Sequence, residues 1–502
     1  MTGARPGEAP LISLVEALAE RAARHPARDA LIAGARHVSY GEFWERIVAV
    51  AHDLAASGVR PGDRVLLAAP SVPEFAYGYF GAHLLGAVAV PLDPNAPQGR
   101  LEELIQRAAP KVMFAAQAVS HSQFGPIRAI GELDALPARA TAFDPPRLDS
   151  LADLLFTTGT TGRPKGVRLT HRNIATSSRH INAVIQCRED DVEVLPLPLY
   201  HAFGLGRLRC NLIAGRTVVL VEGFRLPGEI FAALENHGAT GLVGVPAGFA
   251  ILLRFGSRGL GAFAGQLHHI EIGSAPMPLE HKHSLMEMLP NTELWMHYGL
   301  TEAARSAFIE FHCHRDHLDS VGLAAPGVAM EIRGDDGAAR PRGELGLLWI
   351  GGQHISPGYW DSPDDTARAF ADGWTCTGDV AHIDEAGFVH LRGRRDDMIK
   401  VGGFNVSPDE IERVLCQHAG VREAACVGVP DPRGIAGQVV LAFVVAAESG
   451  RQATDAELSD WVVARLEPYK VPTQYRWVDS VPRTASGKLV RRALREQTES
   501  AT

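Results

Sequence analysis

The chain has 502 residues, more than the ~100–200 residues of one domain, so we expect at least two packing units. Its 46% hydrophobic and 21% charged residues match globular proteins and exclude wholesale disorder and collagen-like structure. The formal net charge of −9 argues against a general nucleic-acid partner.

The first predicted element is an amphipathic helix within residues 1–32, whose apolar stretch contains acidic residues and so differs from a secretory signal. No run of about 18 apolar residues occurs, which excludes an ordinary transmembrane helix. The six cysteines are scattered without a C-x-x-C pair, which argues against a zinc finger and a disulfide framework. These features predict a soluble, cytoplasmic protein.

Residues 30–330 alternate short β-rich runs with amphipathic helical stretches. Strands are expected at 64–69, 87–90, 217–221, 241–245 and 268–273, and helices at 73–85 and from Phe249 onward. Strands separated by helices predict parallel sheets that are covered on both faces. Between residues 340 and 400 the pattern changes to short strands and Gly/Asp turns, which predicts a β-rich subdomain.

The C-terminal residues predict a compact α+β unit. It comprises a helix after Pro408, strands at 421–429 and 438–446, a helix at 455–466 and a final helix from Gly487. The polar segment 392–398 (RGRRDDM) is the candidate boundary between the two parts of the chain. The expected fold class is therefore α/β: a large N-terminal domain of layered α/β sheets with a β-rich subdomain (1–395), plus a small mobile C-terminal α+β domain (396–502).

The strongest local signal is an apolar strand that runs into a loop of glycines, threonines and one lysine. It reads Leu154-Leu155-Phe156-Thr157-Thr158-Gly159-Thr160-Thr161-Gly162-Arg163-Pro164-Lys165-Gly166-Val167, with a helix beginning near His171. Glycines let backbone N–H groups converge on an anion, hydroxyls add donors, and lysine neutralises charge. The loop lacks the Gly-Lys-Ser/Thr ending of a Walker A motif. We predict a polyphosphate-binding loop, with a plain Gly/Thr turn as the alternative.

Further motifs follow this loop in a fixed order over nearly the whole chain. They are 197–204 (LPLYHAFG), 273–276 (GSAP), 298–302 (YGLTE), 343–346 (GELG) with 358–360 (GYW), 374–379 (WTCTGD), 393–400 (GRRDDMIK) continuing to 412, and 482–488 (PRTASGK). The set resembles the adenylate-forming (AMP-binding) superfamily, and most of all the acyl-CoA synthetases and the fatty- or aryl-acid CoA ligases.

The resemblance implies ATP-dependent activation of a carboxylic acid to an acyl-adenylate with release of pyrophosphate, followed by transfer to CoA. ATP, Mg²⁺ and CoA are the implied cofactors, and Glu302 is the implied Mg²⁺ ligand. The departing phosphates would be held by Thr157, Thr158, Gly159, Thr160, Thr161, Gly162 and Lys165. Thr301 would contact the α-phosphate, and the adenine would lie between Tyr298-Gly299 and Gly273-Ser274-Ala275-Pro276. Asp379 would accept hydrogen bonds from the ribose hydroxyls, with Arg394 at the ribose or a phosphate.

The C-terminal motifs imply a domain that adopts two orientations. Lys488 would bridge the substrate carboxylate and the α-phosphate during adenylation, where a point charge on a long stem can stabilise the attack. Rotation at Asp396 would withdraw Lys488 and bring Lys400, Gly402 and Gly403 to the site for thioester formation. Paired glycines permit close approach of a pantetheine arm, although they also suit a plain β-turn.

The acid substrate is predicted only by class. Segments 200–207, 244–249, 271–275 and 297–306 would line the acyl pocket, and their small residues suggest a roomy apolar cavity for a fatty, aryl or polyketide-like acid. His201 has an expected role in the pocket or the thioester step. Arg207 and Arg305 either meet a second substrate carboxylate or face solvent.

Other readings stay open. One is a stand-alone adenylation enzyme that loads an external carrier-protein phosphopantetheine, and a lesser one is a non-catalytic nucleotide-binding protein on the same fold. The partner is a small-molecule carboxylic acid, and a homodimer is compatible with the resemblance. The cluster His312-Cys313-His314-Arg315-Asp316-His317 has ligand-like spacing, but a polar loop is the favoured interpretation.

Overall fold

The computed structural model describes residues 10–116, 127–139, 143–158, 164–401, 404–432, 437–447, 453–483 and 489–499. The chain forms two compact units. Unit 1 comprises residues 1–330 and 350–375, and unit 2 comprises residues 331–349 and 376–502. Among the described helices, none has the length and apolarity to cross a membrane.

Unit 1 contains a six-stranded sheet in the order β6-β5-β3-β4-β7-β8. Its strands are β3 (Arg64–Ala68), β4 (Val88–Pro91), β5 (Val112–Ala115), β6 (Ile127–Ala129), β7 (Leu151–Thr158) and β8 (Pro164–Thr170). All neighbours are parallel except β7 and β8, which pair antiparallel. The helices of this region are α2 (Tyr40–Ala56), α3 (Pro73–Leu84) and α4 (Gln98–Ala108), with the 3₁₀ turn η1 (Ile130–Ala135).

A nine-stranded sheet forms the rest of unit 1, in the order β15-β14-β13-β12-β11-β9-β10-β1-β2. Its strands are β1 (Asp29–Ala33), β2 (Arg36–Ser39), β9 (Val192–Leu195), β10 (Thr217–Leu220), β11 (Gly241–Gly244), β12 (His269–Ile272), β13 (Glu293–Tyr298), β14 (Ala307–Glu310) and β15 (Leu323–Ala324). The helices are α1 (Leu14–Arg24), α5 (His171–Ile185), α6 (Ala202–Ala214), α7 (Pro227–Asn236), α8 (Pro246–Leu253) and α9 (Leu279–Met288), with 3₁₀ turns η2 (Gly256–Arg258), η3 (Leu260–Phe263) and η4 (Arg315–His317).

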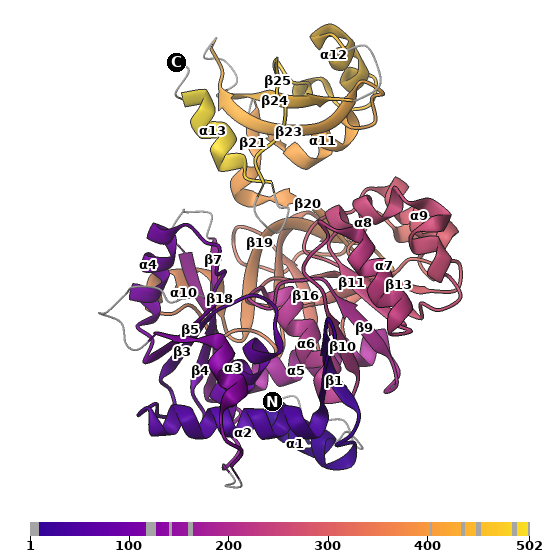
Figure 1. Cartoon of the computed structure of the whole chain (residues 1–502). Coiled ribbons are helices and arrows are strands. Elements are labelled where there is room, and N and C mark those ends of the chain that lie inside the picture. The colour runs from indigo at the N-terminus through magenta and orange to yellow at the C-terminus, as the bar shows by residue number, and fades with distance from the viewer. Residues whose placement is uncertain are drawn as a thin grey trace. The chain divides into compact units, whose positions relative to one another are not determined.

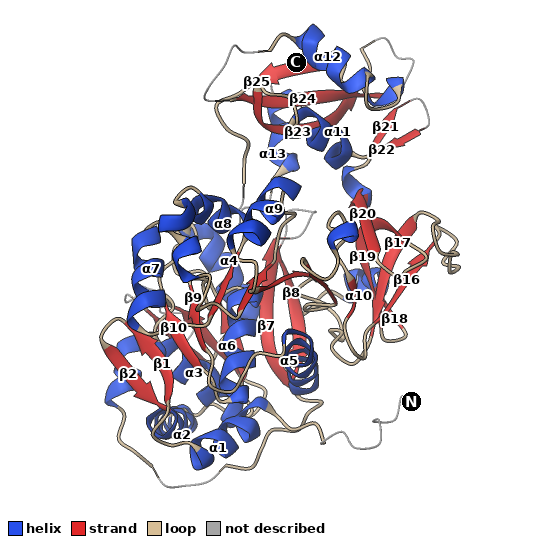
Figure 2. Cartoon of the chain, turned by 90° about the vertical axis from the view of Figure 1, so that its right-hand side faces the viewer, coloured by secondary structure: helices blue, strands red, loops and turns tan. Residues whose placement is uncertain are grey.

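Helices cover both faces of each large sheet. Helices α5 and α6 pack on each other, α5 against β7 and β8, and α6 against β9 and β10, so they lie between the two sheets (Figure 2). One continuous core joins these layers, while α7, α8 and α9 cover the other face of the nine-stranded sheet and α4 that of the six-stranded sheet. This layering confirms the predicted parallel sheets buried between helices.

A smaller sheet in the order β16-β17-β19-β18, with β20 beside β19, lies where the chain passes between the units. Its elements are β16 (Ala329–Arg333), β17 (Gly346–Gly351), α10 (Pro363–Ala369), β18 (Phe370–Ala371), β19 (Trp374–Ile383) and β20 (Val389–Arg394). The chain crosses from one unit to the other within β16, β17 and β19. The predicted β-rich subdomain is therefore present.

The remainder of unit 2, orange to yellow in Figure 1, is an α+β fold. It comprises η5 (Arg395–Asp397), β21 (Ile399–Val401), β22 (Phe404–Val406), α11 (Pro408–Leu415), β23 (Val421–Pro430), β24 (Gln438–Ala446), α12 (Asp455–Val463), η6 (Pro468–Lys470), β25 (Gln474–Trp477) and α13 (Arg491–Glu499). Strands β23-β24-β25 form one sheet, with apolar residues of α11 and α12 in its core. The two-domain α/β class predicted from sequence is confirmed, whereas a single boundary and hinge at 395/396 stays a prediction.

Two local expectations need correction. Helix α8 begins at Pro246, three residues before Phe249, because proline at the first helical position loses no hydrogen bond. The stretch between the glycine-threonine loop and α5 is not a simple continuation of the loop, since Pro164–Thr170 forms β8 and pairs along the whole of β7. Long-range pairing of this kind has no local signal in the sequence.

Candidate active site

The predicted phosphate-binding loop connects the antiparallel strands β7 and β8. Thr157 pairs with Lys165 and Thr158 with Pro164 across the two strands, and the Thr157 hydroxyl donates to the Lys165 carbonyl at 3.4 Å. Gly159, Thr160, Thr161 and Gly162 lie outside the described residues. The register places Thr157 and Lys165 on opposite sides of the loop's base, as a loop that closes around an anion requires.

Lys165 is held by two neighbours from the segment after β17. Its ammonium donates to Asp365 Oδ1 at 3.1 Å and lies 5.1 Å from the centre of the Tyr359 ring. Partial burial acts to raise the pKa of Asp365, but hydrogen bonds from Lys165 and Arg368 hold it below its usual value. An arriving phosphate would compete with Asp365 for the same ammonium.

Glu302 is positioned through the same tyrosine. The Tyr359 hydroxyl donates to Glu302 Oε1 at 2.8 Å, and the Ser356 N–H donates to the Glu302 carbonyl at 2.9 Å. Trp360 N–H in turn donates to the Gly166 carbonyl on β8 at 2.7 Å. Tyr359 therefore joins the predicted phosphate lysine to the predicted metal-binding carboxylate. Sequence reasoning placed Tyr359 in a motif but gave it no role.

Thr301 and Glu302 lie on a tight turn between β13 and β14. Reciprocal backbone hydrogen bonds join Leu300 and Ala303 at 3.0 and 3.2 Å, so the two residues between them project from the turn. A Cβ on Gly299 would clash with the backbone of Arg305, which explains the glycine directly after Tyr298. Tyr298, the last residue of β13, is thereby fixed next to this turn.

The turn after β12 brings Gly273 and Ser274 to the neighbouring strand end. A Cβ on Gly273 would clash with the His297 ring, so only glycine permits this approach. Ser274 has a φ of 74°, a backbone conformation that non-glycine residues rarely adopt and that clusters at functional sites. Because β12 and β13 are adjacent and parallel, the 273–276 turn and Tyr298 lie at the same sheet edge, as the adenine site requires.

A network of buried charges lies behind this edge, and sequence reasoning missed it. Glu271, in the middle of β12, is fully buried and accepts from Arg305 Nε at 2.7 Å, while Arg207 Nη1 lies 3.1 Å from its second oxygen. Burial acts to raise the pKa of Glu271, but these guanidinium groups hold it well below its usual value. Arg207 also donates to Glu193 of β9 through Nε, at 3.0 Å.

The predicted solvent-facing role of the two arginines is therefore wrong, whereas a contact with a second substrate carboxylate stays a prediction that their ion pairs disfavour. Arg207 is fully buried and Arg305 is 3% exposed, so neither faces solvent. The chain's own Glu193 and Glu271 supply their counter-charges, which leaves no unpaired guanidinium for a second substrate carboxylate. The signal in the sequence was a glutamate in each of two apolar strands, VEVL and HIEI, because a buried carboxylate needs a partner.

The glycines of the predicted acyl pocket make room for side chains of the chain itself. A Cβ on Gly206 would clash with the Arg305 guanidinium, and one on Gly244 or Gly248 would clash with the Phe224 ring. The Phe224 ring thus fills the space beside Gly244 and Gly248. His201 caps the start of α6, and its ring lies 4.9 Å from that of Tyr200, at the entrance to the same segment.

In unit 2, Asp379 and Arg394 face each other across β19 and β20. Arg394 Nη1 donates to Asp379 Oδ1 and to the Thr377 carbonyl, both at 3.0 Å. Gly378 has a φ of 75°, so the strand bends at the residue before Asp379. The two predicted ribose-contacting residues are therefore held together as an ion pair.

The predicted hinge residue and the residues predicted to approach pantetheine come next in the chain, after β20. Asp396 lies in the short η5 turn after β20, and Lys400 is an exposed residue of β21. Gly402, Gly403 and Lys488 lie outside the described residues, so their positions stay predictions. The hairpin of β21 and β22 is compatible with both interpretations of the paired glycines.

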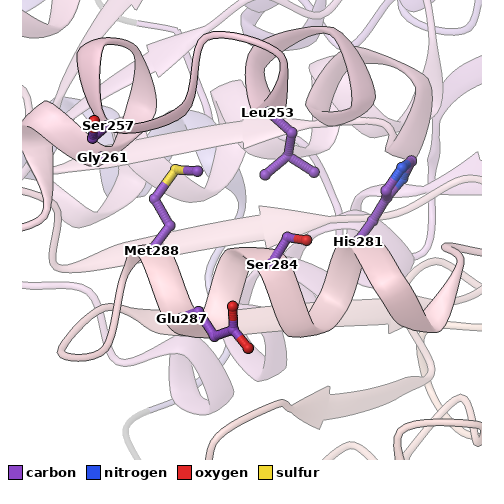
Figure 3. Close-up of a pocket in the computed structure, with 7 residues that line it drawn as sticks. All are labelled: Leu253, Ser257, Gly261, His281, Ser284, Glu287 and Met288. Atoms are coloured by element: carbon purple, nitrogen blue, oxygen red, sulfur yellow. The ribbon is translucent and has the colours of Figure 1, made fainter.

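Two other features lie apart from these residues. His312 contacts the Leu289 carbonyl at 3.2 Å and Arg315 at 3.4 Å through its two ring nitrogens, so both nitrogens of His312 are engaged within the chain. A surface depression between α8 and α9 is lined by none of the predicted site residues, and in it Leu253 points toward α9 (Figure 3).

Comparison with known families shows to which family the chain belongs. A family model described as AMP-binding enzyme matches residues 18–360, and one described as AMP-binding enzyme C-terminal domain matches residues 410–488. The chain belongs to the AMP-binding enzymes. The first match includes the phosphate loop, Tyr298 and Glu302, and the second ends at Lys488.

Related proteins carry the same two regions. A feruloyl-CoA synthase from an Amycolatopsis species is 32% identical, covering 95% of this chain and 97% of its own length. A fatty acid–[acyl-carrier-protein] ligase, ScoC, from Streptomyces coeruleorubidus is 32% identical over 97% of this chain and 96% of its own. The structure of o-succinylbenzoate CoA synthetase from Bacillus subtilis in complex with ATP and magnesium superposes with a TM-score of 0.87 at 28% identity, covering 95% of this chain and 99% of that one.

Proposed function

We propose that this AMP-binding enzyme is an ATP-dependent acid–thiol ligase that forms an acyl-adenylate and then transfers the acyl group to CoA. The observation that carries the proposal is the Lys165–Tyr359–Glu302 arrangement, which unites a phosphate-neutralising cation and a metal-binding carboxylate. Relatives named as CoA ligases over nearly the full chain support it.

The residues of unit 1 fit ATP and Mg²⁺. Glu302 offers a half-buried carboxylate, a hard oxygen donor suited to Mg²⁺, and Tyr359 orients it through one oxygen. When bound, the metal ion supplies positive charge to the phosphates. Lys165 stabilises the charge of the leaving pyrophosphate, and Tyr298 with the 273–276 turn holds the adenine so that the α-phosphate meets the substrate carboxylate in line.

Unit 2 completes the proposed mechanism. Asp379 and Arg394 hold the ribose, and Lys488 stabilises the attack of the carboxylate on the α-phosphate. Rotation about a hinge at Asp396 then exchanges Lys488 for the Lys400–Gly403 turn. Under this proposal the mobile domain comprises residues 396–502.

A substitution of Tyr359 tests the Lys165–Tyr359–Glu302 arrangement on which the proposal rests. The variant Tyr359→Phe is expected to lower kcat/KM for pyrophosphate exchange about 3–10-fold, because one hydrogen bond to Glu302 worth about 0.5–1.5 kcal/mol is lost while the ring under Lys165 remains. Glu302→Gln should cause a far larger loss, together with a higher Mg²⁺ requirement. Equal activity of Tyr359→Phe and the unmodified enzyme at limiting Mg²⁺ would contradict the proposed arrangement.

CoA is the proposed acceptor, with a carrier protein as the second candidate. A relative named as a fatty acid–[acyl-carrier-protein] ligase and one named as a CoA synthase are each 32% identical to this chain, which supports keeping the carrier protein as a candidate acceptor. CoA-dependent release of acyl-CoA and AMP would support the first, and acylation of a phosphopantetheine-bearing carrier without a reaction on CoA would support the second.

Because the reaction consumes ATP and CoA, we propose the cytoplasm as its location. A homodimer, which is compatible with the family resemblance, can be tested by size-exclusion chromatography with light scattering.

The proposed substrate is a fatty or aryl monocarboxylic acid. The neutralised Arg207 and Arg305 disfavour a dicarboxylate, and the Phe224 ring against Gly244 and Gly248 limits the space for bulky acids.

The substitution Phe224→Ala is accordingly expected to raise kcat/KM for bulky acids about tenfold relative to short ones, since pocket space of this size is worth ~1–3 kcal/mol. Phe231→Ala, which removes a ring packed on Phe255 and Phe263, is the matched control and should leave the preference unchanged. An unchanged preference in Phe224→Ala would place the acyl pocket elsewhere.

The first experiment is carboxylate-dependent ATP–pyrophosphate exchange without CoA, over fatty, aryl, dicarboxylic and amino acids. Exchange with fatty or aryl acids is the expected result. Exchange with dicarboxylic acids alone would overturn the proposed substrate class. ATP binding without exchange for any acid would support the non-catalytic reading.

A further inference from the structure

A second cluster of reactive groups lies outside the proposed active site, around Cys187. Cys187 is the second residue after α5, and its sulfur lies within 4.8 Å of a carboxylate oxygen of Asp191 and of a ring nitrogen of His269. Cys187 is partly exposed, whereas Asp191 and His269 are each 2% exposed. The cysteine therefore lies at the edge of a buried polar group.

The His269 ring is fixed in a single orientation. Its Nε2 lies 2.9 Å from Glu193 Oε2, so a carboxylate holds one nitrogen, while Nδ1 has no hydrogen-bond partner within the described part of the chain. Asp191 is already engaged, because it accepts from the Thr240 hydroxyl at 2.6 Å and pairs with His268 at 3.0 Å. Nδ1 lies 3.9 Å from Asp191 Oδ2, beyond hydrogen-bond distance, so the His269 ring faces both this engaged carboxylate and the sulfur of Cys187.

The charges facing the sulfur are mostly positive. From α6, Arg207 Nη2 lies 3.9 Å from Sγ, and from β12 comes His269. Arg216 donates to the Cys187 carbonyl at 2.7 Å and so holds its guanidinium nearby. The negative groups, Asp191 and Glu193, are themselves paired with Thr240, His268, Arg207 and His269.

We propose that Cys187 and His269 form a thiolate–imidazolium pair, oriented by Glu193, which makes Cys187 a site of covalent modification by small electrophiles. Burial acts to raise the pKa of the Cys187 thiol, but His269 and Arg207 hold it below its usual value. Burial acts to lower the pKa of His269, yet Cys187 and Glu193 raise it to about 10. Both directions agree with the geometry of an ion pair.

The chemistry needs only an electrophile from outside, such as hydrogen peroxide. The thiolate attacks one peroxide oxygen, a sulfur–oxygen bond forms as the oxygen–oxygen bond breaks, and hydroxide leaves; the cysteine is oxidised to a sulfenic acid and the peroxide is reduced. Alkylation proceeds in the same way, with halide as the leaving group. Modification removes the negative charge that faces His269 and Arg207.

The other cysteines provide internal controls. The hydrogen bond to Glu310 raises the pKa of Cys313, and burial raises those of Cys210 and Cys426. Cys313 and Cys416 are exposed, so a reaction governed by access alone would modify them before Cys187.

The test is limited alkylation of the intact protein with iodoacetamide, with modification of each cysteine measured by peptide mass spectrometry between about pH 6 and pH 8. Cys187 is expected to react at least about tenfold faster than Cys313 near pH 6, and its rate should rise less steeply with pH than the Cys313 rate, which rises about tenfold per pH unit. Treatment with hydrogen peroxide followed by dimedone should label Cys187 first.

His269→Gln should remove this selectivity. The matched control is His268→Gln, which changes the residue directly before β12, itself paired with Asp191, and should retain the selectivity. A Cys187 rate that rises with pH in parallel with Cys313 would overturn the proposal. Stoichiometric zinc in the purified protein, with alkylation of Cys187 only after chelation, would also overturn it in favour of a metal site. Neither outcome depends on the ligase activity.

Discussion

Replacing Lys488 with alanine is expected to abolish pyrophosphate exchange while largely sparing thioester formation from supplied acyl-adenylate. A single charge aimed at a developing anion contributes on the order of 10²–10³ in rate, and Lys488 acts only in the first half-reaction under the proposed mechanism. The measurement is the rate of each half-reaction, with acyl-adenylate plus CoA as the substrates of the second.

The reciprocal control is the substitution Lys400→Ala. Lys400 is an exposed residue of β21, next to the glycines proposed to approach pantetheine. Its loss should reduce thioester formation and leave exchange nearly unchanged. Because the two lysines belong to the same unit, a general defect in that unit would affect both half-reactions in both variants. Equal losses in the two half-reactions for Lys488→Ala would refute the two-orientation account.

Local patterns in the sequence predicted most elements of the fold. The alternation of apolar strands and amphipathic helices located β3, β4, β10, β11 and β12 within a residue or two of their ends. Capping residues explain some sharp boundaries: Thr170 caps α5 and accepts from the Asn173 N–H. Strand β8 escaped prediction because its glycine and proline are poor strand formers, and only pairing with β7 stabilises it.

In the candidate site, too, some residues could be predicted from local sequence patterns and others only from the structure. Lys165, Glu302 and Asp379 lie in recognisable sequence motifs, so their proposed roles in nucleotide binding could be predicted without a structure. Tyr359 and Asp365 could not be given roles, because they meet Lys165 across about two hundred residues of sequence. The pairing of Arg207 with Glu193 and Glu271 was hidden for a related reason: a charge in an apolar strand shows that a partner exists but not which one.

That buried network is the basis of the second large prediction. Glu271→Gln is expected to lower the free energy of unfolding by about 3–5 kcal/mol, because removing one partner leaves Arg305 and part of Arg207 buried without a counter-charge. Urea denaturation followed by circular dichroism measures the change. Asp149→Asn, which breaks an exposed ion pair with Arg172 in the same unit, should leave stability nearly unchanged.

The pH dependence and a double variant separate charge from packing. The pKa of Glu271 is lowered by folding, so its stabilisation is present above the unfolded carboxyl value of about 4.3 and is lost as the pH falls further. The stability difference between the unmodified chain and Glu271→Gln should therefore shrink below about pH 4.

Combining Glu271→Gln with Arg305→Met should cost about 1–3 kcal/mol less than the sum of the single changes, because the unpaired guanidinium is then gone. Additive losses at every pH would mean that Glu271 fills space in β12 without stabilising the fold through its charge.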